Sequence, residues 1–290
     1  MIVDMREING KVKPIHYGLP RLDTVVHHLK GADCFAKADN TNGYSQVLLE
    51  EDSRKYTAFD SPAGALEHCV MPQGFRNSGP WYQKDMEGVL RELLWRALLQ
   101  YLDDSLLYAK GEANLKPVLE KYFDLLDQHN IKLHPDKLVL FTRTLVWCGK
   151  QLSKNGIKPA PHRVETALNM AEPVTLADMM SYYVYGVAWF RNHIVNFAKI
   201  SAPLYDLWRD GLAPYKRKTM AMAKHFVLAD MPAWKEKGRD AFERVKRALA
   251  TAIETSYFDP EKKTCVFGDA NPEFWCLMLT QCAPGVERQP

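Results

Sequence analysis

The chain has 290 residues, 47% of them hydrophobic, and a formal net charge of +3. This is enough apolar material for a substantial core in one large domain or two ordinary ones. The mild charge neither requires nor excludes a polyanionic partner, because binding depends on where the charge lies.

Cysteine usage and the apolar segments exclude several classes of protein. The six cysteines are scattered without a C-x-x-C pair, so neither a zinc site nor a disulfide framework is expected, and a reducing compartment is favoured. The N-terminus has no apolar run behind a basic start, which argues against a signal peptide. The most apolar stretch, residues 89–108, is interrupted by charged side chains and is not expected to span a membrane. We expect an intracellular protein, cytoplasmic or nuclear, with no membrane partner.

The N-terminal part of the chain predicts short strands. An amphipathic stretch at residues 22–29 precedes a strand at residues 34–38, which ends at the turn-forming pair Asp39 and Asn40. Three further strand segments are expected, at residues 47–50, 56–59 and 65–71, the first two as a pair.

The middle of the chain predicts two helices and then more strands. Apolar residues at helical spacing begin at Tyr82, and propensity alone extends that helix to Leu99. A second helix is expected from Leu115 to His129. Alternating patterns predict strands at residues 138–141 and 145–152.

The C-terminal part is mostly helical in pattern. Residues 156–159 are expected to form a hinge, and the pattern is then helical through Leu207. A basic, poorly patterned insert at residues 215–224 and an amphipathic helix at residues 240–252 follow. The last strands are expected at residues 264–268 and 274–279. This order of elements predicts an α+β domain followed by a helical one.

Two adjacent carboxylates, Asp103 and Asp104, lie between the apolar runs at residues 97–99 and 106–108. If those runs are strands, the acids lie at or beside the tip of a hairpin. Burying acids there is costly without a cation, and Mg²⁺ favours carboxylates together with substrate phosphates. An ordinary polar turn is the alternative, and for an isolated Asp-Asp pair it is the better interpretation.

Asp39, at the end of its own predicted strand, makes a metal site the stronger hypothesis. Two strand-end carboxylate sites predict a clamp for two Mg²⁺ ions about 4 Å apart, as in-line nucleotidyl transfer requires. We therefore expect the carboxylates of Asp39, Asp103 and Asp104 to lie within about 4–7 Å of each other. This arrangement requires the helix to end near Trp95 and a strand to run through Tyr101, against local propensity.

Short motifs along nearly the whole chain carry a family resemblance. They lie at residues 3–9, 19–23, 29–32, 39–44, 55–59, 70–75, 101–104, 131–137, 147–149 and 157–204. In this order and spacing the chain resembles the reverse transcriptases of gypsy-class LTR retrotransposons, with retroviral enzymes as more distant relatives. The resemblance implies an α+β, right-hand polymerase fold: partial fingers, a palm with a Y-x-D-D hairpin, a helical thumb, and the truncated start of a ribonuclease H-like domain.

The resemblance also implies roles for individual residues, with Asp39, Asp103 and Asp104 as catalytic metal ligands. Tyr44 is implied as a steric gate against ribose, and Gln73 is implied to contact the incoming nucleotide. The alternatives are a core aromatic for the tyrosine and a surface-turn residue for the glutamine. Lys137 is implied to neutralise pyrophosphate, and its alternative is a solvated lysine. The implied primer grip consists of Trp147, Cys148 and Gly149.

The chain also departs from the family pattern. Residues 97–100, just before the Y-x-D-D motif, favour helix where the family has β-branched residues, and Asn77-Ser78-Gly79-Pro80 replaces the usual Asn-Ala-Pro. The upstream basic residues that hold the triphosphate have no counterpart. At the other end, Asp269 fits the first acid of ribonuclease H. We therefore expect a weak polymerase without ribonuclease H activity, and residues 264–290 loosely ordered or packed on the thumb.

The sequence predicts three regions: fingers and palm at 1–156, a thumb-like region with the basic insert at 157–233, and a linker helix with the ribonuclease H-like start at 234–290. The expected function is RNA-directed DNA synthesis with two Mg²⁺ ions, or Mn²⁺ in their place. Expected partners are a primed RNA or DNA template and deoxynucleoside triphosphates. Two alternatives stay open: a decayed or domesticated fragment that only binds nucleic acid, and a structural subunit that needs a second polyprotein chain.

Overall fold

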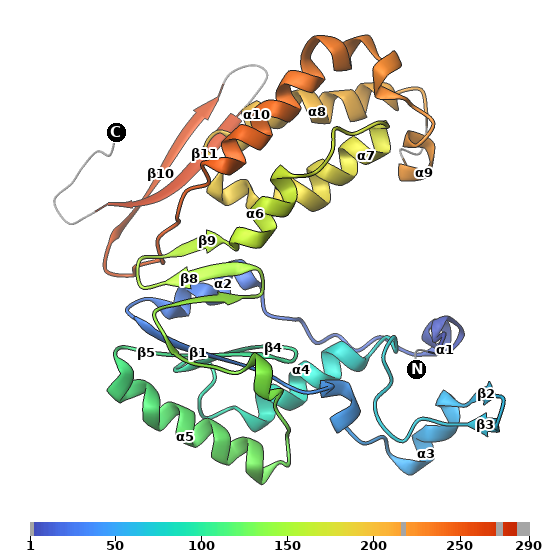
Figure 1. Cartoon of the computed structure of the whole chain (residues 1–290), viewed down its shortest axis with the longest axis vertical. Coiled ribbons are helices and arrows are strands. Elements are labelled where there is room, and N and C mark those ends of the chain that lie inside the picture. The colour runs from blue at the N-terminus through green and yellow to red at the C-terminus, as the bar shows by residue number, and fades with distance from the viewer. Residues whose placement is uncertain (1–2, 216–218, 271–274, 283–290) are drawn as a thin grey trace. The chain divides into compact units, whose positions relative to one another are not determined.

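The computed structural model describes residues 3–215, 219–270 and 275–282. The chain divides into two compact units (Figure 1). Unit 1 comprises residues 1–148 together with 257–290, and unit 2 comprises residues 149–256. Among the described residues, no helix has the length and apolar content needed to cross a bilayer.

The centre of unit 1 is an antiparallel sheet with strand order β4-β5-β1-β6 (Figure 1). The strands are β1 (Cys34–Asp39), β4 (Leu98–Tyr101), β5 (Asp104–Ala109) and β6 (Val139–Thr142). Helices α4 (Ser78–Val89) and α5 (Glu112–Gln128) cover one face of this sheet. The strand predicted at residues 34–38 and the helix predicted from Leu115 to His129 are confirmed.

Strand β1 explains why the two faces of the sheet differ. Cys34, Ala36 and Ala38 alternate along it and are buried against the helices, where their small side chains allow a close approach. Lys37 and Asp39 point to the opposite face because successive side chains alternate. Phe35 on this second face is also buried, so the face carries charged groups only toward the Asp39 end of the strand.

The remaining elements of unit 1 are short and connect these parts. The amphipathic stretch at residues 22–29 forms two short helical segments. These elements are α1 (Arg6–Lys11), α2 (Leu22–Val25), η1 (Val26–Leu29), η2 (Gly43–Gln46), α3 (Glu51–Arg54), η3 (Lys55–Thr57), β2 (Phe59–Ser61), β3 (Gly64–Leu66), η4 (Pro135–Lys137) and β7 (Thr144–Trp147).

The helix that propensity extends from Tyr82 to Leu99 is wrong in its second half. Helix α4 ends at Val89, and Leu98 and Leu99 lie in β4 with both side chains fully buried. Burying a leucine stabilises by about 1.5–3 kcal/mol, whereas helix propensities differ by tenths of a kcal/mol per residue. Burial therefore decides the conformation, and the strand that the Y-x-D-D motif requires is formed. Between the end of α4 and the start of β4, the backbone passes through the left-handed region at Trp95, whose φ is 65°.

Several shorter predictions are also wrong. Residues 47–50 form no strand and 55–57 form a 3₁₀ turn, because Leu48 is exposed to solvent and Thr57 bonds locally to the carbonyl of Arg54. Of the strand expected at 65–71, only Ala65 and Leu66 lie in a strand, β3, which pairs with β2. The continuous strand at 145–152 is interrupted by left-handed backbone at Cys148 and Gly149, with φ of 46° and 76°.

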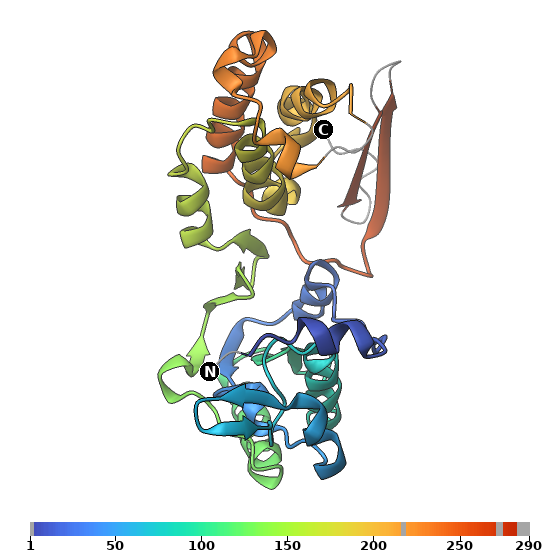
Figure 2. The same cartoon turned by 90° about the vertical axis from the view of Figure 1, so that its right-hand side faces the viewer.

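Unit 2 is a bundle of helices that also carries a β-hairpin. The hinge expected at residues 156–159 is instead strand β9, paired with β8. Helices predicted through Leu207 and over 240–252 are confirmed, and Figure 2 shows the bundle from a second side. Residues 216–218 of the basic insert lie outside the described residues. The elements are β8 (Lys150–Ser153), β9 (Ile157–Pro159), α6 (Pro161–Leu168), α7 (Leu176–Ser181), η5 (Tyr182–Val187), η6 (Ala188–His193), α8 (Phe197–Gly211), α9 (Met220–Ala223), η7 (Leu228–Asp230), η8 (Trp234–Gly238) and α10 (Arg239–Ala250).

Strands β10 (Lys263–Ala270) and β11 (Trp275–Cys282) form a two-stranded ribbon, drawn in Figures 1 and 2. Their residues are counted with unit 1. The two strands expected here are confirmed, and their described residues pair in continuous register. Asp269 lies opposite Cys276 in that register. The side chain of Asp269 and residues 283–290 lie outside the described part, and the likeness to ribonuclease H stays a prediction.

Helix α7 begins with a capping box that yields a stability prediction. Asp178 N donates to Thr175 Oγ1 at 3.1 Å, and Thr175 N donates to the Asp178 carboxylate at 2.9 Å. Hydrogen bonds from the Thr175 side chain and backbone lower the pKa of Asp178 below its ordinary 3.8. We expect Thr175→Ala to lower the free energy of unfolding by about 1 kcal/mol, measured by urea denaturation near neutral pH.

The pH dependence of that loss has a defined sign. Because the folded-state pKa of Asp178 is lowered, its contribution is fully present above pH 3.8 and disappears as the pH falls through the folded-state value. The difference in the free energy of unfolding between the variant and the wild type should therefore become smaller below pH 3.8. Thr166→Ala, at an exposed threonine inside α6, is the matched control and should stay within about 0.5 kcal/mol. A pH-independent gap would contradict this account.

Candidate active site

The three predicted acids meet at one end of the unit 1 sheet. Asp39 and Asp104 are directly opposed in the β1–β5 register, an arrangement that places Cα atoms about 4.5–5.5 Å apart. Asp103 belongs to the two-residue loop that joins β4 to β5, and its carbonyl accepts a hydrogen bond of 3.0 Å from Asn40 N. The register and the hairpin together bring the three acids to one place; their catalytic role stays a prediction.

Two lysines are paired with these carboxylates. Lys37 Nζ lies 3.2 Å from Asp104 Oδ1, and Lys137 Nζ donates to Asp39 Oδ1 at 2.9 Å. The Asp104 oxygen is buried and accepts no hydrogen bond, because the ammonium of Lys37 is close but not aligned with it. Partial burial, followed by the charges of Asp104 and Asp39, raises the pKa of Asp103. With three carboxylates and two paired lysines, the site holds more negative charge than its lysines neutralise.

The loop that carries Asp103 is strained. Leu102 has φ 53°, in the left-handed region that costs an L-residue roughly 1–2 kcal/mol. Both of its backbone polar groups are held by glutamines: its N–H donates to Gln83 Oε1 at 2.7 Å, and its carbonyl accepts from Gln100 Nε2 at 2.5 Å. Gln83 and Gln100 are themselves almost fully buried. The glutamines therefore hold the loop from its core side.

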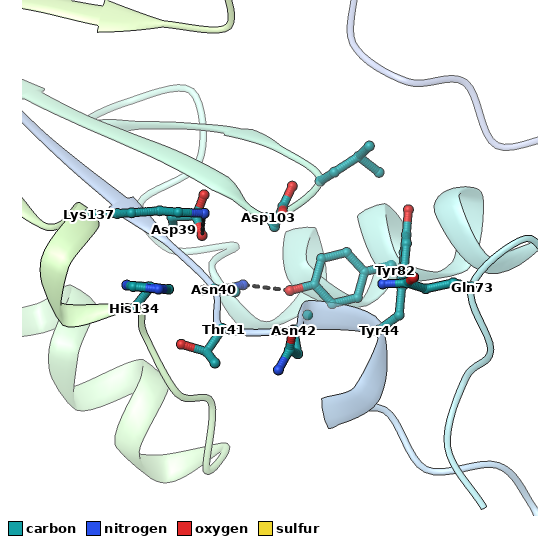
Figure 3. A pocket seen from close by; sticks show the side chains of 12 residues that line it. Asp39, Asn40, Thr41, Asn42, Tyr44, Gln73, Tyr82, Asp103, His134 and Lys137 are labelled. Carbon is teal, nitrogen blue, oxygen red and sulfur yellow. Dashed lines mark hydrogen bonds and ion pairs between the residues drawn. The ribbon is translucent and has the colours of Figure 1, made fainter. Parts of the chain in front are cut away.

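A pocket of about 330 Å³ opens beside the acids. Figure 3 shows Asp39 and Lys137 at one end of it and Tyr44 and Gln73 at the other, with Asp103 between them. The pocket is lined by Asp39, Asn40, Thr41, Asn42, Gly43, Tyr44, Gln73, Tyr82, Leu102, Asp103, His134 and Lys137. All of these residues belong to unit 1. One end of the pocket is therefore charged, and the other is lined by an aromatic ring and an uncharged amide.

Tyr82, from helix α4, fixes the floor of this pocket. Asn40 Nδ2 donates to its hydroxyl at 2.6 Å, the bond drawn in Figure 3, and the ring of Tyr44 packs edge-on against its ring at 5.3 Å. A Cβ at Gly43 would lie 2.5 Å from the same hydroxyl, so a larger residue there would force Tyr82 to move. The position of Tyr44 therefore depends on Tyr82.

The predicted primer grip does not act as three equivalent side chains. Trp147 is fully buried in unit 1, so its indole packs in the protein interior. Cys148 Sγ lies 4.0 Å from Asp104 Oδ2, next to the acids. Gly149 opens unit 2, and its carbonyl accepts a hydrogen bond from Ala160 N at 3.1 Å. Any contact with a primer by these three residues stays a prediction.

The donor set suits a hard cation that also binds substrate. Within the described residues, no three histidine, cysteine or carboxylate side chains form a ready-made metal cage. Mg²⁺ does not need one, because it binds through one or two carboxylates and fills its octahedron with water and substrate phosphates. The orphaned oxygen of Asp104 and the excess negative charge fit such an ion. Asp39, Asp103 and Asp104 are the residues that would hold it.

Sequence reasoning missed the residues that support the acids. Lys37 was not singled out, although it stands two residues before Asp39 and therefore on the same face of its strand. Gln83 lies on the buried face of α4 between Tyr82 and Met86, and Gln100 lies in a buried strand. A glutamine at an apolar position of the pattern is the signal that would have found both.

Comparisons with known proteins agree with this geometry. Residues 1–165 match the family described as reverse transcriptase (RNA-dependent DNA polymerase). The Pol polyprotein of transposon gypsy from Drosophila melanogaster is 27% identical over 283 residues, covering 97% of this chain and 26% of the relative. An enzymatic polyprotein of Cassava vein mosaic virus is 28% identical over 204 residues, covering 70% of this chain and 31% of that protein. The chain thus spans about a quarter to a third of the length of these relatives.

Solved structures define the fold. The foamy viral protease-reverse transcriptase dRH, in complex with double-stranded DNA, has a TM-score of 0.84 at 21% identity, over 97% of this chain and 46% of that one. The same viral enzyme in complex with an RNA/DNA hybrid has a TM-score of 0.80. The fold is therefore the right-hand polymerase fold expected from the motifs. The chain belongs to the reverse transcriptase family, and the resemblance to gypsy-class retrotransposon polyproteins is confirmed.

The charge imbalance at the acids predicts a stability effect. Because the pKa of Asp103 is raised, this group contributes stability below pH 3.8, and that stability is lost as the pH rises through the raised value. At neutral pH in metal-free buffer, Asp103→Asn should therefore raise Tm, modestly because water reaches the Asp103 side chain and screens its charge. Mn²⁺ at about a hundred times its dissociation constant should stabilise the wild type by about 2.7 kcal/mol.

The same Mn²⁺ should leave the Asp103→Asn variant nearly unaffected. Differential scanning fluorimetry with and without Mn²⁺ measures both effects on the full chain. Asp124→Asn, at an exposed carboxylate of α5, is the matched control and should respond to Mn²⁺ like the wild type. A lower metal-free Tm for Asp103→Asn would contradict the charge argument.

Proposed function

We propose that this chain is the polymerase core of a retrotransposon reverse transcriptase and that it extends a primer on an RNA or DNA template. The observation that carries the proposal is the meeting of Asp39, Asp103 and Asp104 beside a nucleotide-sized pocket. Two Mg²⁺ ions, with Mn²⁺ as a substitute, are the proposed cofactors. The family assignment and the intact set of three acids support this function.

The residues of the chain divide the work of nucleotidyl transfer between them. Bound divalent ions would supply charge neutralisation at the primer hydroxyl and at the phosphates. Asp39 and Asp104, from facing strands, and Asp103, from the loop, hold the negative charge that keeps such ions in place. Lys137, exposed at the end of the pocket, has an ammonium group that can turn from Asp39 to a leaving pyrophosphate. Positioning and electrostatics are the main requirements of this reaction.

The other end of the pocket suits the nucleoside. Tyr44 presents a half-buried ring where a sugar would lie, and Gln73 is an exposed amide beside it. We propose that Tyr44 excludes the ribose 2′ hydroxyl and that Gln73 contacts the incoming deoxynucleotide. A primed template is the proposed partner, and the foamy viral enzyme has been solved with double-stranded DNA and with an RNA/DNA hybrid. We also propose that residues 1–156 form the fingers and palm, 157–233 the thumb-like region, and 234–290 the linker helix with the ribonuclease H-like start. Residues 147–149 are the proposed primer grip, and the proposed location of the protein is intracellular.

Primer extension on the purified full chain tests the proposed function. With a primed RNA template, Mg²⁺ and deoxynucleotides, the wild type should extend the primer. Asp103→Asn should reduce the rate by about 10³-fold or more, because it removes charge aimed at the reacting phosphates. Asp124→Asn, which carries the same chemical change on an exposed helix face, should keep the wild-type rate. Extension that survives Asp103→Asn would contradict the assignment.

A sugar-selectivity assay tests the role of Tyr44. Tyr44→Val should raise ribonucleotide incorporation relative to deoxynucleotide incorporation by up to about 100-fold, the range over which a pocket rejects one added hydroxyl. Competition of ribonucleotides with deoxynucleotides in single-nucleotide extension gives the ratio. Tyr205→Val, at an exposed tyrosine of unit 2, is the control and should leave it unchanged. Unchanged selectivity in Tyr44→Val would show that another residue excludes the ribose.

A further inference from the structure

A continuous hydrogen-bonded network lies behind the acids, on the face of the sheet that packs against the helices. Gln83 Nε2, from α4, donates to the carbonyl of Gln100 at 3.1 Å and to Glu87 Oε1 at 2.7 Å. Its Oε1 accepts from the N–H of Leu102 at 2.7 Å. Tyr17 Oη donates to the other oxygen of Glu87. The side-chain amide of Gln83 therefore joins helix α4 to the Y-x-D-D hairpin at two backbone groups, the carbonyl of Gln100 and the N–H of Leu102.

The second branch of the network reaches helix α5. Tyr122 Oη donates to Ser105 Oγ at 3.0 Å, and Ser105 Oγ donates to Gln100 Oε1 at 2.6 Å. Gln100 Nε2 then donates to the carbonyl of Leu102 at 2.5 Å. Tyr122, Ser105, Gln100 and Gln83 are each at most 1% exposed. Two helices therefore hold one residue of the loop through a fully buried chain of polar groups.

The donors and acceptors of this network fit one arrangement only. A backbone N–H can only donate, so the amide of Gln83 must present its oxygen to Leu102, and its NH₂ then faces Gln100 and Glu87. Glu87 accepts through both oxygens, and its second partner, Tyr17, fixes it in place. Every polar group of the strained residue is thus matched to a fixed partner. A buried network that is satisfied in this way specifies a single geometry.

We infer that Gln83 is a positioning residue for the metal-binding loop: it holds Leu102 in the left-handed conformation from which Asp103 lies beside Asp39 and Asp104 lies opposite it. This inference rests on the proposed function, because only the proposed function assigns metal binding to the loop. Gln83 does not line the pocket and acts only through the backbone of Leu102. An apolar residue of similar size would fill the same space, but it would leave the Leu102 N–H buried without an acceptor.

The test compares Gln83→Leu with a stability control, using the full chain. Three quantities are measured: hydrogen exchange of residues 99–106, Mn²⁺ affinity from the electron paramagnetic resonance signal of free Mn²⁺, and kcat together with duplex affinity in primer extension. Gln83→Leu should speed exchange in the hairpin and weaken Mn²⁺ binding by about 10-fold or more, the usual loss when a group that orients a metal ligand is removed. The kcat should fall in parallel, while duplex affinity stays unchanged.

Leu119→Ala is the control for stability. Leu119 lies on α5 in the same core but has no side-chain group that could hydrogen-bond in the network, so its truncation lowers stability without removing a hydrogen bond from the loop. This variant should keep Mn²⁺ affinity within about threefold of the wild type. Equal weakening of Mn²⁺ binding in Gln83→Leu and Leu119→Ala would overturn the inference.

A second variant covers the case in which Gln83→Leu does not fold. A neutral glutamic acid in Gln83→Glu keeps an oxygen opposite the Leu102 N–H, and it should retain Mn²⁺ affinity within about threefold of the wild type. The inference would be overturned if Gln83→Leu speeds hydrogen exchange in the hairpin but leaves Mn²⁺ affinity unchanged. It would also be overturned if Gln83→Glu loses as much Mn²⁺ affinity as Gln83→Leu does. If Asp103→Asn binds Mn²⁺ as tightly as the wild type does, the proposed function is overturned instead. Hydrogen exchange would then still decide whether Gln83 holds the loop.

Discussion

The mutual repulsion of Asp39, Asp103 and Asp104 is the constraint on which the rest of unit 1 depends. Two unit charges 5 Å apart repel by about 3 kcal/mol at an effective dielectric of 20. Neither β-strand pairing nor loop closure favours this clustering, so the surrounding structure must enforce it. Lys37 and Lys137 offset part of the repulsion, each by pairing with one carboxylate. Three carboxylates face two paired lysines, so an excess of negative charge remains, as the proposed binding of a divalent cation requires.

The enforcement comes from the opposite face of the same sheet. A strand alternates its side chains, so β5 can present Asp104 to the site while Ser105 points into the core. Ser105 is the point at which α5 is joined to the hairpin, through Tyr122 on one side and Gln100 on the other. Charge on one face and a satisfied polar network on the other are therefore two consequences of a single strand register. A slip of one residue would exchange them.

The sequence predicted the parts of this site that follow local rules. The strand before Asp39, the helix from Leu115 and the pair Asp103 and Asp104 are all visible as patterns of apolar residues broken by acids. The end of helix α4 at Val89 was not visible, because the leucines that follow it favour a helix until their burial in β4 is taken into account. The link from Gln83 to Leu102 joins residues 19 apart through a backbone amide, and no periodicity encodes such a bond.

The two ends of the pocket, one with Asp39 and the other with Tyr44, are joined through Tyr82. Asn40 follows Asp39 directly, and its side chain holds the hydroxyl of Tyr82, the ring that supports Tyr44. Because Gly43 has no side chain, the ring of Tyr82 can approach the backbone between Asn40 and Tyr44, and a Cβ at position 43 would collide with that ring. A displacement of Tyr82 would therefore move the proposed sugar gate and disturb the residue next to the first acid together. Because α4 carries both Tyr82 and Gln83, a single helix sets the position of the nucleotide pocket and of the loop that bears Asp103.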